Sequence, residues 1–155
     1  MTTCGETCDL RQMCSLATRQ GGEDPIGNAP AAEHYLLVEV ATPWERNVLG
    51  SQYFPGELRS VLEEADKRTL AVKFLAMVPD ESAPTGHVRL LYFQRPTVPF
   101  AAYEKLDYVV PPSALAPLAR TVLWEKADLP RFESYRQHSS HIRDMLVCTH
   151  GSRDA

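Results

Sequence analysis

The strongest constraint on the fold is an apolar run, an amphipathic helix and a second apolar run, in that order along the chain. Tyr35–Val40 is almost continuously apolar, which is typical of a central strand covered on both faces. Phe54–Lys67 carries an apolar stripe with helical spacing, made of Leu58, Val61, Leu62 and Ala65. Leu70–Val78 predicts a second strand, which Pro79 ends. The order indicates an α/β domain.

The following segments add two strands and a helix. His87–Gln94 and Glu104–Val110 are predicted strands, and the short connections after the second and third strands favour antiparallel neighbours. Ser113–Lys126 is a predicted helix, with Ser113 as its N-cap and Pro117 either in its first turn or at its true start. The complete order is that of a thioredoxin-like mixed sheet with flanking helices, with one helix missing.

The loop after the first predicted strand excludes one activity of that fold. Pro43 stops the strand, and Pro43-Trp44-Glu45-Arg46 stands where a thioredoxin carries its pair of cysteines. Thiol–disulfide exchange needs a thiolate that attacks, and this loop has no cysteine. We expect Trp44 to cover the end of the strand as part of the core, with a platform for a substrate as the less favoured alternative.

Composition limits the core and excludes two classes of partner. With 155 residues, of which 44% are hydrophobic, the chain can bury one core. A net charge of −4 and a pI near 5.7 argue against nucleic-acid binding, which needs a basic face. No apolar run reaches the roughly 18 residues of a membrane span, and the N-terminus lacks the pattern of a secretory signal. We therefore predict a cytoplasmic protein with neither nucleic-acid nor membrane partners.

A thiol and an imidazole follow the last apolar run. Met145–Val147 has the character of a short buried strand, and Cys148, His150 and Gly151 come directly after it. The carboxyl ends of strands are where α/β folds bind ligands, so this loop is the candidate site. An inert buried thiol is the alternative that the residues alone favour. Nucleophilic catalysis by Cys148 and His150 is disfavoured, because the base usually comes from elsewhere in the fold, and no catalytic residue is predicted.

Two stretches carry a resemblance to a known family. Leu146–Asp154, which reads Leu-Val-Cys-Thr-His-Gly-Ser-Arg-Asp, resembles the start of the iron–sulfur domain in the sucrase/ferredoxin-like family. That family belongs to the thioredoxin-like ferredoxins. Cys14-Ser15, Arg19 and Gly22–Gly27 are similar to the opening of the same proteins. The resemblance therefore covers both ends of the chain.

The resemblance implies an electron-transfer protein with a [2Fe–2S] cluster. It implies that Cys148 is the first cluster ligand, and that His150 and Gly151 are the family's His-Gly pair, whose glycine lets the loop fold back toward the cluster. His150 itself is not expected to be a ligand. In the family further cysteines follow this loop at once, and this sequence ends at Ala155. We therefore expect an N-terminal portion with an incomplete ligand set, and a cluster in the complete protein rather than in this chain.

The chain is predicted to divide into four parts. Residues 1–33 are a polar leader, whose Cys4, Cys8 and Cys14 are interpreted as free thiols, with a second metal site or a redox switch as the alternative. Residues 34–127 are a degenerate thioredoxin-like domain. Residues 128–141 are a linker with solvated histidines at 138 and 141. Residues 142–155 begin a ferredoxin-like domain, the first strand of a second, incomplete thioredoxin-like unit.

Three functions remain, in order of preference. The first is an electron carrier, whose redox partner protein the sequence does not identify. The alternative is a non-catalytic thioredoxin-like protein-interaction module. A sugar hydrolase comes last, because glycoside hydrolysis ordinarily needs two carboxyl groups across a cleft, and no such pair stands at the ends of the predicted strands.

Overall fold

The computed structural model describes residues 32–80, 84–98, 102–139 and 141–146, and those between 32 and 143 form one compact unit. The predicted order of the first four strands and the two helices is confirmed, with boundaries that differ by a few residues. The elements are β1 (His34–Glu39), the short 3-10 helix η2 (Val48–Gly50), α2 (Gly56–Lys67), β2 (Val72–Met77), β3 (Val88–Gln94), β4 (Glu104–Val110), α3 (Pro112–Trp124) and the 3-10 helix η3 (Lys126–Tyr135).

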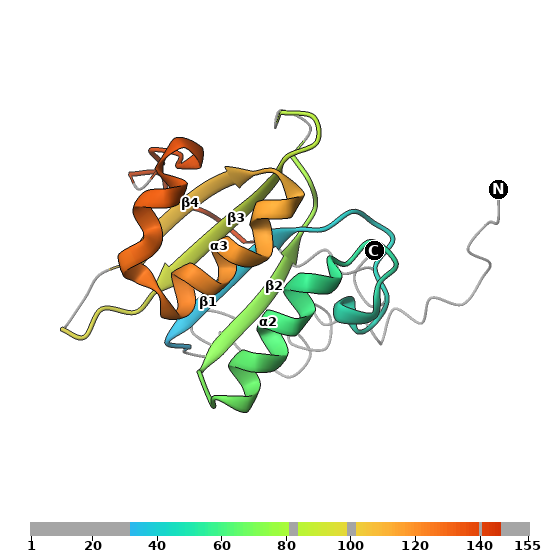
Figure 1. Cartoon of the computed structure of the whole chain (residues 1–155), viewed down its shortest axis with the longest axis horizontal. Coiled ribbons are helices and arrows are strands. Elements are labelled where there is room, and N and C mark those ends of the chain that lie inside the picture. The colour runs from blue at the N-terminus through green and yellow to red at the C-terminus, as the bar shows by residue number, and fades with distance from the viewer. Residues whose placement is uncertain (1–31, 81–83, 99–101, 140, 147–155) are drawn as a thin grey trace, which may run out of the picture. The chain divides into compact units, whose positions relative to one another are not determined.

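The four strands form one mixed sheet in the order β2-β1-β3-β4 (Figure 1). β1 is parallel to β2, with Leu36 opposite Phe74, and antiparallel to β3, with Leu36 opposite Tyr92. β4 is antiparallel to β3. The sheet and its helices make the α/β, thioredoxin-like arrangement that the sequence predicts.

One strand pairing differs from the prediction. The short connection after β2 favoured β2 and β3 as antiparallel neighbours, but β1 lies between them. α2 carries the chain from β1 back over the sheet to a parallel β2, as crossover connections do. β3 then occupies the other side of β1, where Leu90 and Tyr92 are buried. Burial beside the central strand outweighs the preference of a short connection for an adjacent strand.

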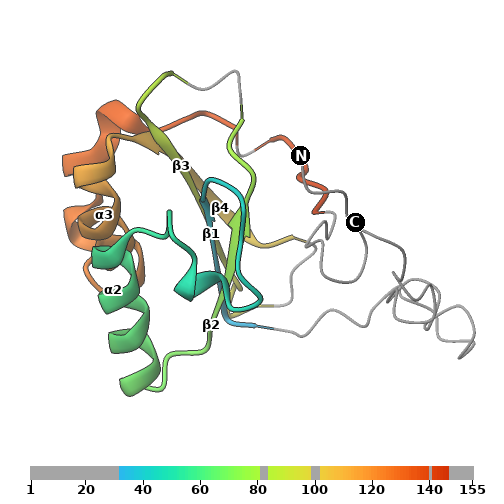
Figure 2. The same cartoon turned by 90° about the vertical axis from the view of Figure 1, so that its right-hand side faces the viewer.

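Helices α2 and α3 lie on the same face of the sheet (Figure 2). The stripe predicted on the first helix is confirmed, since Leu58, Val61 and Ala65 of α2 are buried. The core lies between these helices and the sheet, and it includes Leu36, Val38, Leu90, Tyr92, Tyr108, Leu115, Leu118 and Val122. Each large aliphatic side chain buried there contributes about 1.5–3 kcal/mol relative to an exposed one.

Helix α3 begins earlier than Pro117. Its N-cap is Pro111, it starts at Pro112, and Pro117 lies inside it, so Ser113 is a helical residue rather than the cap. Pro112 suits a first helical position, because the amide hydrogen that it lacks has no partner there. An internal proline costs a helix about 3 kcal/mol. Burial of Leu115, Leu118 and their neighbours on α3 offsets that cost.

Residues predicted to be a linker are partly built into the core. η3 covers 126–135, and its Phe132 is buried. Beyond it Arg136 forms a bridge with Tyr108 of β4, and the Gln137 amide donates to the Asp107 carbonyl at 2.8 Å. The proline and the many polar residues of this segment indicated a loop, but one aromatic side chain anchors it against α3 and the sheet. His138 and His141 are exposed, as expected.

The strand predicted at 145–147 is not found in the described part of that segment. Residues 141–146 contain no strand, and Met145 and Leu146 are 88% and 55% exposed. A strand needs a neighbouring strand to satisfy its backbone groups, and none pairs with residues 141–146 in the described sheet. Val147 lies outside the described residues, so the predicted strand at 145–147 stays a prediction.

Candidate functional site

The residues predicted to bind a cluster lie outside the described part of the chain. These are Cys148, His150 and Gly151. The leader cysteines Cys4, Cys8 and Cys14, which were interpreted as free thiols, also lie outside the described residues. The described residues contain no cysteine. They also hold no group of three or more histidine, cysteine, aspartate or glutamate side chains that could bind a metal ion. Among the described helices, none is long and apolar enough to cross a membrane.

The loop after β1 is held by its own hydrogen bonds. The indole Nε1 of Trp44 donates to the Val40 carbonyl at 2.9 Å, and the ring packs against the core, as predicted. The Glu45 amide donates to the Ser51 hydroxyl at 2.8 Å, and Ser51 is buried. The Thr42–Pro43 peptide bond is cis. With a carboxylate and an indole where thioredoxins carry thiols, this loop cannot exchange disulfides.

A buried polar cluster joins β1, β3 and β4. Glu39 accepts hydrogen bonds from the amides of Asp80 and Arg89, at 3.0 and 2.8 Å. The Arg89 guanidinium donates to both carboxylate oxygens of Asp107, and the Ser139 hydroxyl donates to one of them. A cavity of about 300 Å³ borders this cluster. Because these carboxylates already accept hydrogen bonds from the fold, we interpret the cluster as structural.

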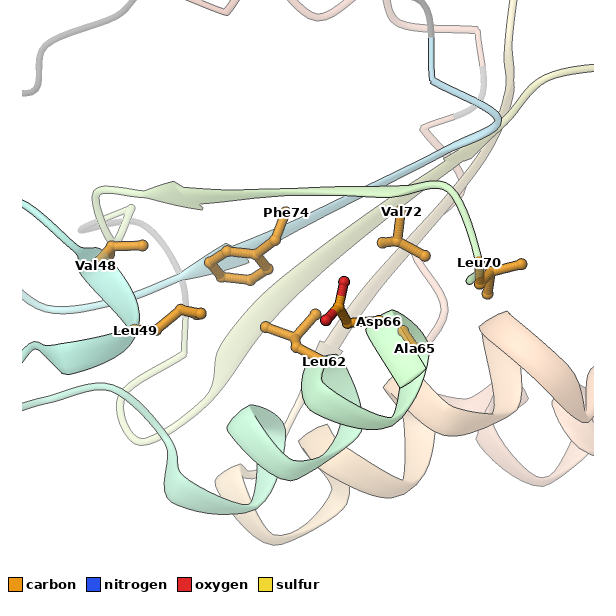
Figure 3. A pocket seen from close by; sticks show the side chains of 8 residues that line it. All are labelled: Val48, Leu49, Leu62, Ala65, Asp66, Leu70, Val72 and Phe74. Atoms are coloured by element: carbon orange, nitrogen blue, oxygen red, sulfur yellow. The ribbon is translucent and has the colours of Figure 1, made fainter. Parts of the chain in front are cut away.

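A second cavity, of about 250 Å³, lies between α2, η2 and β2 (Figure 3). One lining residue is charged: the carboxylate of Asp66 extends from α2 toward the strand. The other lining residues are apolar: Val48, Leu49, Leu62, Ala65, Leu70, Val72 and Phe74. The Asp66 carboxylate forms no hydrogen bond or ion pair with another of the described residues. This cavity, called the edge pocket below, is therefore an apolar site with one exposed anionic group.

The edge pocket opens beside a strand whose outer side is unpaired in the described sheet. The His34 amide donates to the Ala71 carbonyl and the Val40 amide donates to the Met77 carbonyl, at 3.2 and 2.9 Å, so these carbonyls face β1. Backbone groups alternate in direction along a strand, so the amide and carbonyl groups of Phe74 and Ala76 point away from β1. β2 lies at one edge of the sheet.

The end of α2 gives the edge pocket its shape. The amides of Thr69 and Leu70 donate to the carbonyls of Asp66 and Ala65, at 2.9 and 3.0 Å. This is the Schellman pattern, which closes a helix with a residue in the left-handed region, here Thr69 with φ of 55°. The turn directs Leu70 into the pocket lining.

Neither the edge pocket nor the polar cluster was predicted. A signal for the cluster exists in the sequence: Arg89 is the one charged residue of β3, and Asp107 lies between the apolar Leu106 and Tyr108 of β4. For the pocket the signal is weaker, because Asp66 looks like any other polar residue next to the stripe on α2. Its role depends on which strand α2 packs against.

Comparison with protein-family models, with curated proteins and with solved structures gives no match for this chain.

Proposed function

We propose that this chain is part of a [2Fe–2S] electron-transfer protein of the sucrase/ferredoxin-like type, in which the thioredoxin-like sheet is a scaffold and Cys148 is a cluster ligand. One observation carries the proposal: a thioredoxin-like sheet without a thiol on the loop after β1, in a chain that also contains Cys148-Thr149-His150-Gly151. When bound, such a cluster supplies one-electron transfer. The redox partner would be another protein.

The chemistry of the donor set supports the proposal in part. A [2Fe–2S] cluster takes four ligands, by default thiolates, and the chain has four cysteines. Cys148 would be one ligand. The others would come from Cys4, Cys8 and Cys14 or from a second chain. Gly151 would let the loop approach the cluster closely, because glycine adds no side chain there.

Anaerobic reconstitution with iron and sulfide tests the proposal, with visible absorption and electron paramagnetic resonance after reduction as readouts. The expected result is a [2Fe–2S] signal, from this chain or from any longer chain that the gene encodes, and its loss in Cys148→Ser. Cys8→Ser shows whether this leader thiol is a ligand: the signal persists if Cys8 is free and is lost if it binds the cluster. A signal that survives Cys148→Ser, or no signal from any form of the protein, would count against the proposal.

The second candidate is a non-catalytic thioredoxin-like protein-interaction module. The edge pocket beside the unpaired side of β2 favours it, because edges of sheets are common sites of peptide binding. This function needs no cluster. It predicts that the chain binds a partner protein equally well before and after iron reconstitution, and that neither form reduces a disulfide substrate. A partner that binds only the iron-loaded form would contradict it.

A further inference from the structure

We propose that the edge pocket is the docking site of an extended peptide segment of a partner protein, which pairs with β2 as an added strand. Such a segment would place one apolar side chain in the pocket and a lysine or arginine against Asp66. The proposal rests on the described residues alone and is independent of the cluster. It deepens the interaction-module function by naming the chemistry of the partner, and its test is separate from iron binding.

The backbone of β2 requires an extended occupant. Phe74 and Ala76 direct their amide and carbonyl groups to the outer side, where the described sheet continues no further. The Val72 amide already donates to the Leu70 carbonyl at 2.7 Å, so pairing begins beyond it. The opposite edge differs, because Arg136 and Gln137 contact β4 through backbone interactions. In the described sheet, the edge at β2 is therefore the one whose backbone amide and carbonyl groups can pair with a strand of another chain.

The lining of the pocket requires an apolar side chain. Ala65 is buried, but the other apolar residues of the lining are partly exposed, and they come from α2, η2, β2 and the turn before β2. No residue of β2 is buried, whereas Leu36, Leu37, Val38 and Glu39 on β1 are. A strand laid along β2 directs alternate side chains to the face that α2 covers. One of them would enter the pocket between Leu62 and Phe74, the two side chains facing each other in Figure 3.

The charge of the pocket is complementary to a cation. Two other charged side chains near the end of α2, Glu64 and Arg68, pair with each other, and Glu64 also binds Arg120 of α3 at 2.6 Å. Those pairs lie on the α3 side. Asp66 instead faces the pocket, and its carboxylate is the charged group in the lining. Residues two apart on a strand share a face, so a basic residue two positions from the apolar one would reach Asp66.

Titration of the 15N-labelled chain of residues 1–155 with a designed peptide tests the proposal by amide chemical shifts. The probe is a ten-residue threonine-rich peptide with one central leucine and a lysine two positions after it. The expected shifts are centred on Phe74 and Ala76, with further shifts at Asp66 and Leu70. Shifts centred on β4, or no shifts with millimolar peptide, would overturn the proposal.

Matched probes separate the three contacts. Replacement of leucine by serine tests the pocket, and it should weaken binding about tenfold or more. Two peptides N-methylated at alternate amides test the strand pairing, since one of them places its methyl groups against β2 and should lose binding. Equal binding by both methylated peptides would show that no added strand forms.

A charge exchange tests Asp66. Asp66→Lys should weaken binding of the lysine peptide about five- to tenfold, because it replaces a partly exposed ion pair with repulsion. The peptide with glutamate in place of lysine should bind Asp66→Lys better than it binds the unchanged chain. Asp66 is exposed, so folding should be unaffected, and thermal unfolding checks this. No gain on charge exchange would overturn the assigned role of Asp66. Concentration-dependent self-association through β2 without peptide would identify a second copy as the occupant and overturn the proposed partner.

Discussion

Arg89 of β3 and Asp107 of β4 form an ion pair with two hydrogen bonds: Nε to Oδ1 at 3.0 Å and Nη2 to Oδ2 at 2.7 Å. The Asp107 side chain is 1% exposed and the Arg89 side chain 30%. The Ser139 hydroxyl donates to the same carboxylate, which ties the segment after η3 to the sheet. A buried carboxylate is thus compensated by one cation and one hydroxyl.

Removal of the cation should therefore destabilise the fold. Arg89→Met is expected to lower the free energy of unfolding by about 2–4 kcal/mol, because it leaves a buried carboxylate without its charge partner. The double variant Arg89→Met/Asp107→Leu should recover most of the loss. Urea denaturation of both measures this. Arg95→Met is the control, since Arg95 and Glu33 form an exposed pair at 3.5 Å, and it should change stability by less than about 1 kcal/mol. An Arg89→Met chain as stable as the control would contradict the prediction.

Replacement of Thr69 by glycine is expected to stabilise the fold. Its φ of 55° lies in the left-handed region, which is strained for a β-branched residue and accessible to glycine. Relief of this strain in Thr69→Gly should stabilise the folded chain, and the greater freedom of glycine in the unfolded chain should offset part of that effect. The net free energy of unfolding should rise by about 0.5–1 kcal/mol. Thermal unfolding measures the shift. Thr69→Ala keeps a Cβ and should give less of the gain. A loss of stability in Thr69→Gly would show that the Thr69 side chain makes a contact worth more than the strain.

Most of the fold could be predicted because it depends on local patterns. The near-continuous apolar run of β1 and the stripe on α2 identify a buried strand and its covering helix, whatever lies beyond them. The neighbours of β1 could not be predicted from the length of the connections. They depend on tertiary packing, because Leu90 and Tyr92 of β3 are buried when β3 lies beside β1. The place of Phe132 in the core was also hidden, since a single aromatic residue in a polar segment has no periodicity to detect.

The candidate site also has one part that the sequence predicts and one part that it does not. The sequence alone shows that the loop after β1 has no thiol. The structure adds the hydrogen bond from Trp44 to the Val40 carbonyl. The edge pocket could not be predicted, because it forms where Asp66 and Leu62 of α2 meet Phe74 of β2. The cluster ligands proposed around Cys148 stay a prediction.

Phe132 provides a test of whether 126–135 belongs to the core. Phe132→Ala should lower the free energy of unfolding by about 3–5 kcal/mol, the usual effect of removing a buried aromatic ring. Arg131→Ala is the control on the same 3-10 helix, because Arg131 is exposed and its change should stay within about 0.5 kcal/mol. Chemical denaturation compares the two. Equal small effects from both substitutions would mean that the segment behaves as a linker in solution.

His34 and Tyr92 form a pair that should make stability depend on pH. Tyr92 Oη and His34 Nδ1 are 2.8 Å apart, and the two rings stack with centroids 5.8 Å apart. Burial raises the pKa of Tyr92 to about 12, so its hydroxyl stays protonated near neutral pH and can donate to a neutral imidazole. Burial lowers the pKa of His34, the charge of Lys126 lowers it further, and Glu33 acts in the opposite direction.

A lowered histidine pKa means that the unfolded chain binds the proton more readily than the folded one. The contribution of neutral His34 to the free energy of unfolding is therefore fully present above the unfolded pKa of about 6.5. It falls as the pH drops below that value, toward the pKa of the folded state. Melting temperatures between pH 7.5 and 5 measure this loss, and His34→Gln should reduce it. His138→Gln is the matched control, because His138 is exposed, and it should keep the loss of the unchanged chain. If His34→Gln loses stability over the same pH range by the same amount, another group is responsible.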